Sequence, residues 1–571
     1  MEKFYNIDEK YQTLVAYFNM EYAIHQSLKT YSGGLGFLVG SHFRSAYDLK
    51  QNMIGIGILW SYGYYDQTRS EDGSMSVAYR RKEYYFLDEL NVKVSVIINQ
   101  KEVFIKAFLL KPETFGSAPV LFLTTDIEEN DFLARTITHK LYDANEEARI
   151  AQEIVLGIGG VKILEQLEIQ PDIYHMNEGH SLPLIFELYS KIKDKEALKQ
   201  KVVFTTHTPE KAGNQDHSIP LLEKMGFFNG IPTEEAKKLV SCYDNDRLNL
   251  TLSALRSAKI SNAVSKIHGK IANSMWQPYE GISNIISITN AQNRRFWADK
   301  VMIRALDEHE DYELIARKKH LKRLLFDVIA NQSGKMFDTE ILTIVWARRF
   351  VEYKRPGLIK YDTKRFINLL TRSRYPIQII FAGKPHPQDS ASVNLFNELV
   401  YFSKTYKRMA VLVDYELELS SILKKGADLW LNTPRLTREA SGTSGMTACM
   451  NGSIHFSINA GWHPEFAQHK INCFTIPECN TNLLTQEQDE IDNKNMMDML
   501  EDLIIPLYYE NTKGWVQMMK NSMNGVLHQF DSGRMAHEYY TNLYNYNRGE
   551  CDLAFQPIGR SKHLITCCND F

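Results

Sequence analysis

Short apolar runs alternate along the chain with longer segments in which apolar residues recur every three or four positions. Most of the runs are almost continuously apolar, as in strands buried on both faces of a parallel sheet, whereas residues 92–98 alternate as a half-exposed strand would. The clearest examples are the runs 92–98, 202–205, 341–345 and 377–382 and the helix-like segments 312–332 and 391–404. Alternating strands and helices predict α/β layers.

A charged segment near residues 300–338 divides this pattern into two halves. Lys and Arg are concentrated at residues 317–323, just before the fresh apolar run at residue 341. We interpret this segment as a long helix between two α/β halves, with its charges on a solvated face. After about residue 485 the chain is helical in pattern. We therefore predict an N-terminal part (1–300), a C-terminal part (301–485) and a helical segment (486–571) that packs back on the first part.

Composition narrows the class of protein. The 571 residues include 66 Lys and Arg against 69 Asp and Glu, which leaves a net charge of −3. Such a balance disfavours a nucleic acid polymer or an anionic membrane as the main partner. Hydrophobic residues make up 44% and charged residues 24%, as in globular proteins rather than disordered chains.

The cellular compartment is predicted from the N-terminus and the cysteines. The first ten residues carry five charged side chains and no apolar core of a signal peptide. No apolar run approaches the roughly 18 residues of a membrane span. Seven cysteines form no Cys-x-x-Cys pair, and Cys567–Cys568 has no histidine at zinc spacing. We expect a cytoplasmic protein with reduced thiols and no metal.

A glycine-rich segment, Tyr31 to Phe37, lies between the apolar run 14–18 and a helix that runs through Asp48. Glycines before a helix allow an anion such as phosphate to approach the free N–H groups of its first turn. A tight turn that needs glycine only for its dihedral angles explains the segment equally well. The spacing is neither a dinucleotide fingerprint nor a P-loop.

A basic cluster follows the apolar run 341–345. Four cations occur in the eight residues 348–355, directly beyond the carboxyl end of a predicted strand, where open α/β sheets bind ligands. Arg349 and Lys354 could both point at one anionic group. Cations at the start of a helix oppose its dipole unless an anion binds there, so we favour a phosphate site.

A turn of small residues, 438–446, follows the strand-like run 427–431. Ser, Thr and Gly surround Glu439, so the turn offers hydroxyl and backbone donors beside one carboxylate. Such a loop suits the hydroxyls of a sugar ring. It runs straight into an apolar stretch and is too short to be a flexible linker.

Two histidine-containing segments, 174–181 and 204–209, also end strand-like runs. His175 and His180 are five residues apart on a turn, which disfavours a shared metal ion. His207 fits either a hydrogen bond to a ligand hydroxyl or a purely structural role.

In combination, these segments resemble the α-glucan (glycogen/maltodextrin) phosphorylases, especially their shorter bacterial type. The similar segments are Ala16–Glu21, Tyr31–Gly36, Met176–Ser181, Phe204–Pro209, Arg348–Arg355, Phe381–Lys384, Glu439–Met446 and Asn451–Gly452. They keep the order of the family across roughly residues 14–465. The resemblance implies an α/β fold of the GT-B type, with two Rossmann-like domains facing across a cleft, and it favours a homodimer.

The resemblance also implies roles for individual residues. Gly33, Gly34 and Gly36 would lie over the phosphate, and Arg349 and Lys354 would hold it. The small-residue turn would bind the sugar near its 3-hydroxyl through Glu439, Ser441, Gly442 and Thr443. His207 and Asn262 would contact the 6-hydroxyl side of the sugar. We expect Arg349, Lys354 and His207 to act in catalysis.

One departure from the family concerns its cofactor. In the family the turn continues Gly-Met-Lys, and the lysine forms a Schiff base with pyridoxal phosphate. This chain has Gly445, Met446 and Thr447, and threonine has no amine. Residues 289–293 and 459–461 have also drifted from the family pattern. The expected cofactor is therefore none.

These observations predict a pyridoxal-phosphate-independent, phosphorylase-like hexosyltransferase. It would move a hexosyl group, preferably glucosyl, from a sugar nucleotide or sugar phosphate with retention of configuration. The acceptor would be an α-glucan or a small molecule such as a nucleoside. One alternative is a phosphorylase that holds pyridoxal phosphate without a covalent bond. Another is a non-catalytic glucan-binding or regulatory protein.

Overall fold

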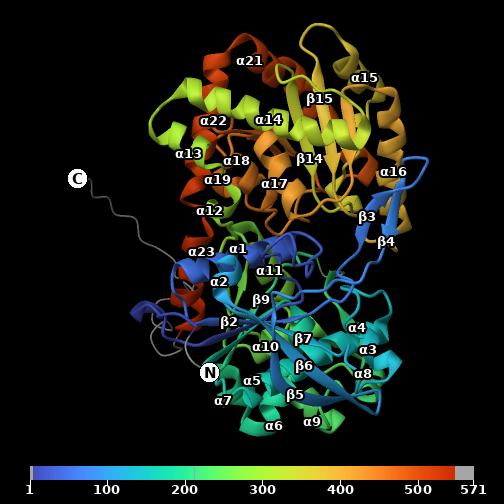
Figure 1. The fold of residues 1–571 in the computed structure, drawn as a ribbon, viewed down its shortest axis with the longest axis vertical. Helices are drawn as coiled ribbons and strands as arrows, with labels where there is room; N and C mark the ends of the chain where they lie inside the picture. The colour runs from blue at the N-terminus through green and yellow to red at the C-terminus, as the bar shows by residue number, and fades with distance from the viewer. Residues whose placement is uncertain (1–3, 211–212, 547–571) are drawn as a thin grey trace, which may run out of the picture.

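A computed structural model describes residues 4–210 and 213–546, and within these residues two large sheets form the cores of two α/β halves (Figure 1). The first sheet has nine strands in the described residues. From edge to edge they are β13 (Ile285–Ser287), β12 (Ile260–Ala263), β9 (Val202–Thr205), β8 (Ile173–Asn177), β1 (Val15–Phe18), β2 (Met53–Ile58), β7 (Val120–Thr124), β6 (Lys101–Leu110) and β5 (Asp88–Ile98). Only the pairs β7–β6 and β6–β5 are antiparallel.

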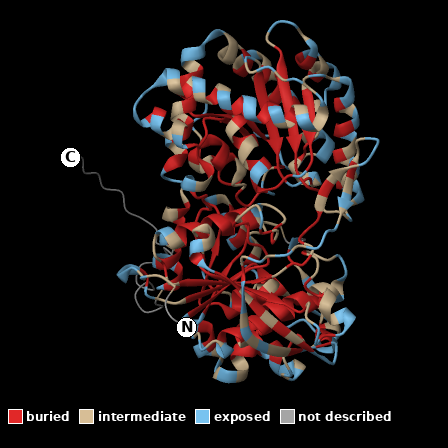
Figure 2. Cartoon of the chain, in the orientation of Figure 1, coloured by how far each residue is buried: buried red, intermediate tan, exposed pale blue. Residues whose placement is uncertain are grey.

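The second sheet has six described strands, and every neighbouring pair in it is parallel. Its order is β16 (Met409–Leu412), β15 (Ile377–Ala382), β14 (Leu342–Ala347), β17 (Leu429–Asn432), β18 (Ile454–Ile458) and β19 (Cys473–Ile476). Every residue of β14 and β15 is buried, because helices cover both faces of the sheet. The strands predicted from the apolar runs are therefore confirmed, including the edge strand β5, which is partly exposed (Figure 2).

The two sheets, one mostly and one wholly parallel and each with helices on its faces, form the α/β GT-B fold that the resemblance implied. The carboxyl ends of β1, β8 and β9 in the first sheet and of β14, β15 and β17 in the second lead into loops that line one cavity between the halves. Open parallel sheets bind ligands at these strand ends, so the topology places the candidate site there.

The long charged segment forms helix α14 (Asp311–Ser333), which packs against α17 (Leu417–Gly426) of the second half. Its charges do not all face solvent. Lys322 is buried, and its ammonium lies 2.5 Å from the carboxylate of buried Asp428. Lys318 is also buried and donates to the carbonyl of Asn451 at 2.9 Å. The expectation of a solvated basic face is thus wrong for Lys318 and Lys322, because both reach inward to acceptors of the second half.

The C-terminal helices contact both halves. Helix α22 (Thr512–Leu527) packs on α18 (Ser444–Cys449), whereas α23 (Ser532–Tyr539) packs on α1 (Gly34–Asp48). At the second contact the hydroxyls of Ser45 and Ser532 lie 2.6 Å apart. The division of the chain at residues 300 and 485 stays a prediction. Cys567 and Cys568 lie outside the described residues.

Two further findings concern the described part of the chain. None of its helices has the length and apolar character that a membrane crossing requires. It also contains no group of three or more His, Cys, Asp or Glu side chains arranged to hold a metal ion.

Candidate active site between the two halves

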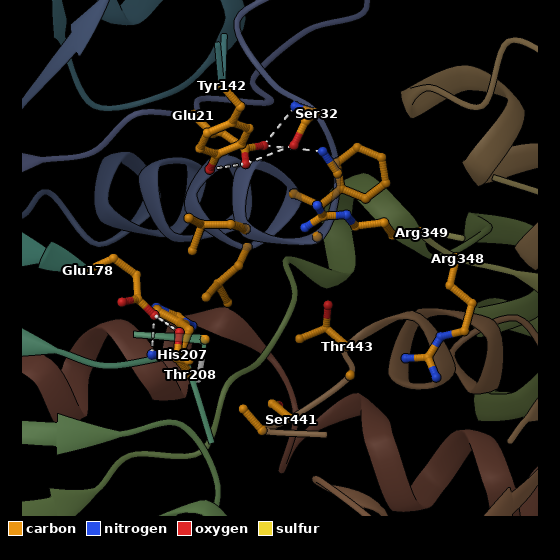
Figure 3. A pocket seen from close by; sticks show the side chains of 18 of the residues that line it. Glu21, Ser32, Tyr142, Glu178, His207, Thr208, Arg348, Arg349, Ser441 and Thr443 are labelled. Atoms are coloured by element: carbon orange, nitrogen blue, oxygen red, sulfur yellow. Dashed lines mark hydrogen bonds between the residues drawn. The ribbon is translucent and has the colours of Figure 1, made fainter. Parts of the chain in front are cut away.

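A cavity of about 670 Å³ lies between the two halves and takes its lining from both. The first half contributes the glycine segment and the loops after β8 and β9. The second half contributes the basic cluster and the small-residue turn. Figure 3 shows Glu178 and His207 on one side of the cavity and Arg348, Arg349 and Thr443 on the other.

The glycine segment is held by a buried carboxylate. Glu21 accepts hydrogen bonds from the backbone N–H of Ser32 at 2.7 Å and of Gly33 at 3.2 Å, and from the hydroxyl of Tyr142 at 2.6 Å (Figure 3). The loop is therefore fixed ahead of α1. Gly33 and Gly34 line the cavity with open space where a side chain would stand.

Gly36 has a different role from the other two glycines. It is not among the residues that line the cavity, and a Cβ atom there would lie 2.6 Å from the Cβ of Tyr31. The structure thus assigns Gly36 to close packing of α1 rather than to a place over the phosphate. This corrects the role drawn from the resemblance.

In the basic cluster, two of the cations are already paired with Glu439. A guanidinium nitrogen of Arg348 lies 3.0 Å from its carboxylate, and the amine of Lys354 lies 3.2 Å from it. Burial alone would raise the pKa of Glu439, yet these two cations hold it below its usual value. Glu439 therefore positions the two cations, so its carboxylate is not available for hydrogen bonds to a sugar alone.

Arg349 is a cavity cation that is available to a ligand. Its side chain is exposed to the cavity and forms no hydrogen bond or ion pair with any residue that the structure describes. In Figure 3 it extends from the second half toward the group formed by Glu21, Tyr142 and Ser32. A guanidinium without a carboxylate partner, facing the first turn of a helix, is suited to a phosphate.

The small-residue turn lies against the paired cations. Gly442 has φ +79°, and a Cβ atom there would lie 3.1 Å from a guanidinium nitrogen of Arg348 and 3.2 Å from the carboxylate carbon of Glu439. Only glycine fits this position without strain. The buried hydroxyl of Ser441 has no partner among the described groups, so it can accept or donate to a ligand hydroxyl. The Thr443 hydroxyl accepts from Gln292 at 2.9 Å.

His207 lines the opposite wall. Its Nε2 lies 2.8 Å from the side-chain oxygen of Asn177, and its backbone N–H donates to Glu178 at 2.5 Å. Burial lowers the pKa of His207 to about 3, so the ring is neutral. A neutral imidazole can orient a sugar hydroxyl but does not supply a positive charge.

Asn262 does not belong to the cavity lining. It lies in β12, fully buried, where its side-chain oxygen accepts from Thr205 at 2.6 Å and its amide donates to Tyr539 at 3.1 Å. The position of Asn262 therefore does not fit the expected contact with the 6-hydroxyl side of a sugar in this cavity. The tail helix α23 supplies the competing partner, which local sequence does not reveal.

The structure also adds cavity residues that the sequence analysis did not select. Glu178 follows β8 with φ +69° and ψ +169°, a backbone conformation that is unusual outside glycine, and burial raises its pKa to about 7. It lies in the segment 174–181, and its position directly after a predicted strand could have indicated that it lines the cavity. Further examples are Glu21, Tyr142, Arg149, Arg348, Lys384, His386 and Lys424. No local sequence pattern indicated that Lys424, on α17, lines the cavity.

The residues present do not fit pyridoxal phosphate in the manner of the family. Thr447 is fully buried in α18, and its hydroxyl donates to the carbonyl of Ser444 at 2.9 Å. It offers no amine for a Schiff base. Of the three cavity lysines, Lys354 is paired with Glu439 and Lys384 with Glu416 at 3.0 Å, whereas Lys424 has no such partner in the described structure but lies on α17 and not at position 447. We derive no chemical step through this cofactor.

The protonation state of Lys354 predicts that the affinity for a phosphorylated sugar depends on pH. Burial, followed by the nearby charge of Arg348, lowers the pKa of Lys354 to about 8. The amine is charged below this pH and loses its proton above it. We expect the affinity for glucose 1-phosphate, measured by calorimetry, to fall above pH 8 by up to about tenfold per pH unit. Lys354→Arg, which stays charged, should remove the decline, and a flat wild-type profile up to pH 10 would contradict this origin.

Comparison with known proteins agrees with the fold. Residues 282–470 match the family model described as carbohydrate phosphorylase. The chain is 32% identical to a maltodextrin phosphorylase of Thermococcus litoralis over 94% of this chain and 71% of that protein. It is 29% identical to a glycogen phosphorylase of Aquifex aeolicus over 95% of this chain and 88% of that protein. It is 46% identical to an uncharacterised protein of Methanocaldococcus jannaschii over 93% of this chain and 99% of that protein.

Two largely parallel sheets with a cavity between them, together with these relatives, define a GT-B glycosyltransferase of the phosphorylase type. The chain belongs to the carbohydrate phosphorylase family. It is accordingly an enzyme, a glucan phosphorylase-like glycosyltransferase.

Proposed function

We propose that the enzyme transfers a hexosyl group, preferably glucosyl, from a sugar nucleotide or sugar phosphate to an acceptor hydroxyl, with retention and without pyridoxal phosphate. The observation that supports this most is an unpaired Arg349 in the cavity lining together with the lack of an amine at buried position 447, on helix α18, which begins at the cavity residue Ser444. On this proposal the phosphate-binding part of the site is kept, whereas the covalent anchor of the cofactor is absent.

In the proposed reaction the bond between C1 of the sugar and the donor phosphate oxygen breaks, and C1 bonds to the acceptor oxygen on the same face. The acceptor proton passes to the departing phosphate. Arg349, Lys354 and the positive end of α1 stabilise the charge that develops on that phosphate. His207 and Ser441 orient the sugar hydroxyls, and Glu439 keeps Lys354 in place.

The acceptor is either an α-glucan or a small molecule. The relatives named maltodextrin phosphorylase and glycogen phosphorylase support a glucan. The same names support the second candidate, a phosphorylase that holds pyridoxal phosphate without a covalent bond. We also propose a homodimer on the basis of family membership.

A ligand panel tests the proposal. Thermal unfolding should be recorded with UDP-glucose, ADP-glucose, glucose 1-phosphate, and pyridoxal phosphate with inorganic phosphate. A ligand at 100 times its dissociation constant stabilises the folded protein by about 2.7 kcal/mol, which is readily measured. We expect stabilisation by a sugar nucleotide or glucose 1-phosphate alone. If stabilisation requires pyridoxal phosphate, the second candidate replaces the first, and if no donor stabilises or turns over, the protein is a non-catalytic binder.

A further inference from the structure

Lys424 is a buried amine that faces the cavity without an acceptor. The residue is only 2% exposed, it lines the cavity from α17, and its amine forms no hydrogen bond or ion pair within residues 4–210 and 213–546. The amine lies 3.6 Å from the ring centre of Trp297 and 5.3 Å from that of Phe37. A cation can rest on these aromatic faces, but they accept no conventional hydrogen bond.

Other buried lysines of the second half have acceptors for their amines, unlike Lys424. The amine of Lys318 donates to two backbone carbonyls, at 2.9 and 3.1 Å, and that of Lys322 is paired with Asp428. An amine buried without an acceptor costs free energy of folding. Burial also lowers the pKa of Lys424 well below its usual value, so the empty site favours the neutral amine. A ligand that brings an anion would supply the missing partner.

The surroundings of Lys424 favour an anion at this point. Phe37 belongs to the first turn of α1, a helix of 15 residues whose N-cap, Gly33, provides no side-chain acceptor or donor. The first N–H groups of a helix have no intrahelical partner, and the dipole adds positive potential there. Lys424 therefore lies against the same helix end that the glycine segment opens to the cavity.

Arg349 approaches this helix end from another direction. Its charge acts on Tyr142, whose hydroxyl donates to Glu21, the carboxylate that holds Ser32 and Gly33. Arg349 and Lys424 are thus two basic side chains of the cavity that lack carboxylate partners in the described structure and lie near the start of α1. Arg149, on α4 (Glu146–Ile154), also lines the cavity without a carboxylate partner among the described residues, but its charge acts on His180. Arg349 and Lys354 together are enough to bind one phosphate group. A diphosphate has a second phosphate group, which needs a basic partner of its own.

We propose that Lys424, with the first turn of α1, binds the second phosphate of a diphosphate donor, while Arg349 and Lys354 bind the other. The donor is then a nucleoside diphosphate sugar rather than a hexose 1-phosphate. This inference rests on the proposed function and names its substrate class. The chain has lost the amine at position 447 on α18 and carries an amine on the neighbouring helix α17 instead.

Binding measurements with Lys424→Met test the assignment. Methionine matches the lysine side chain as far as Cε and lacks the amine, so most of the buried volume stays filled. We expect the dissociation constant of UDP-glucose or ADP-glucose, whichever binds the wild type, to rise about tenfold to a hundredfold, as for loss of a charged hydrogen bond. The dissociation constant of glucose 1-phosphate should change little. Lys425→Met is the matched control, because Lys425 is the next residue of α17 and does not line the cavity.

Proton uptake provides a readout that a purely structural role of Lys424 would not produce. Calorimetry in two buffers of different ionisation enthalpy should show that the wild type takes up protons when it binds the sugar nucleotide, and that Lys424→Met takes up fewer. An equal loss of affinity for both donors, or unchanged uptake in the variant, would overturn the assignment.

Two outcomes separate this inference from the proposed function. If glucose 1-phosphate binds and reacts but no sugar nucleotide binds, the diphosphate assignment fails and hexosyl transfer stands. If pyridoxal phosphate and borohydride label Lys424, identified by peptide mass, and the sugar nucleotide does not protect it, the amine has a covalent role. The anion assignment and cofactor independence then both fail.

Discussion

Replacement of Arg349 by alanine is expected to lower kcat/KM for hexosyl transfer by about a hundredfold or more, as for loss of a preorganised group that stabilises transition-state charge. The melting temperature should stay unchanged, because the Arg349 side chain has no hydrogen bond or ion pair in the described structure to lose. Steady-state kinetics with the donor that stabilises the wild type, and thermal unfolding without ligand, measure the two effects separately.

The matched control is Arg374→Ala. This arginine is exposed and stacks on Tyr375, away from the cavity lining, so its loss changes the net charge by the same amount. We expect its kcat/KM to equal that of the wild type. An Arg349→Ala enzyme with near-normal kcat/KM would show that the departing phosphate is held elsewhere, and the proposed mechanism would fail.

Gly383→Ala is expected to destabilise the folded protein by about 3 kcal/mol or more, since overpacking and backbone strain each cost a few kcal/mol. Gly383 follows β15 with φ +152°, and a Cβ atom there would lie 1.9 Å from the carbonyl oxygen of Arg348. Relief of this overlap requires movement of the strand end that carries Arg349. Transfer activity should therefore fall together with stability, as measured by denaturant unfolding and kinetics.

Gly357→Ala is the control variant, because it adds the same methyl group at another glycine of the second half. The nearest atoms would be 3.8 Å from its Cβ, and its φ of −84° suits any residue. We expect its stability to lie within about 0.5 kcal/mol of the wild type, as for ordinary surface substitutions. Equal stability of the two alanine variants would contradict the close approach between Gly383 and Arg348.

Much of the cavity could be predicted because its residues follow strands. A buried strand is recognised from a local apolar run, and parallel topology brings the carboxyl ends of different strands together. For this reason the structure places most of the expected residues in one cavity, although their roles stay proposals. These are Gly33, Gly34, His207, Arg349, Lys354, Glu439, Ser441, Gly442 and Thr443.

The failures have a common cause, which is packing between segments far apart in the chain. Asn262 ends a strand as the others do, but Tyr539 of the C-terminal helix occupies its amide. Lys318 and Lys322 have the sequence appearance of a solvated basic stretch, yet both amines reach acceptors more than 80 residues away in the chain. No local pattern specifies such partners.

The sequence by itself determined the α/β class, the strands, the clustering of cations after β14 and the absence of an amine at position 447, because each depends on residue type and short-range spacing. Only the tertiary structure decided that the carboxylate of Glu439 pairs with both Arg348 and Lys354 and that Arg349 is left unpaired. It also decided that Lys424 lines the cavity with its amine over the ring of Trp297. Those features depend on which side chains from separate helices and loops come within a few ångströms of one another. That outcome is set by the packing of the whole chain.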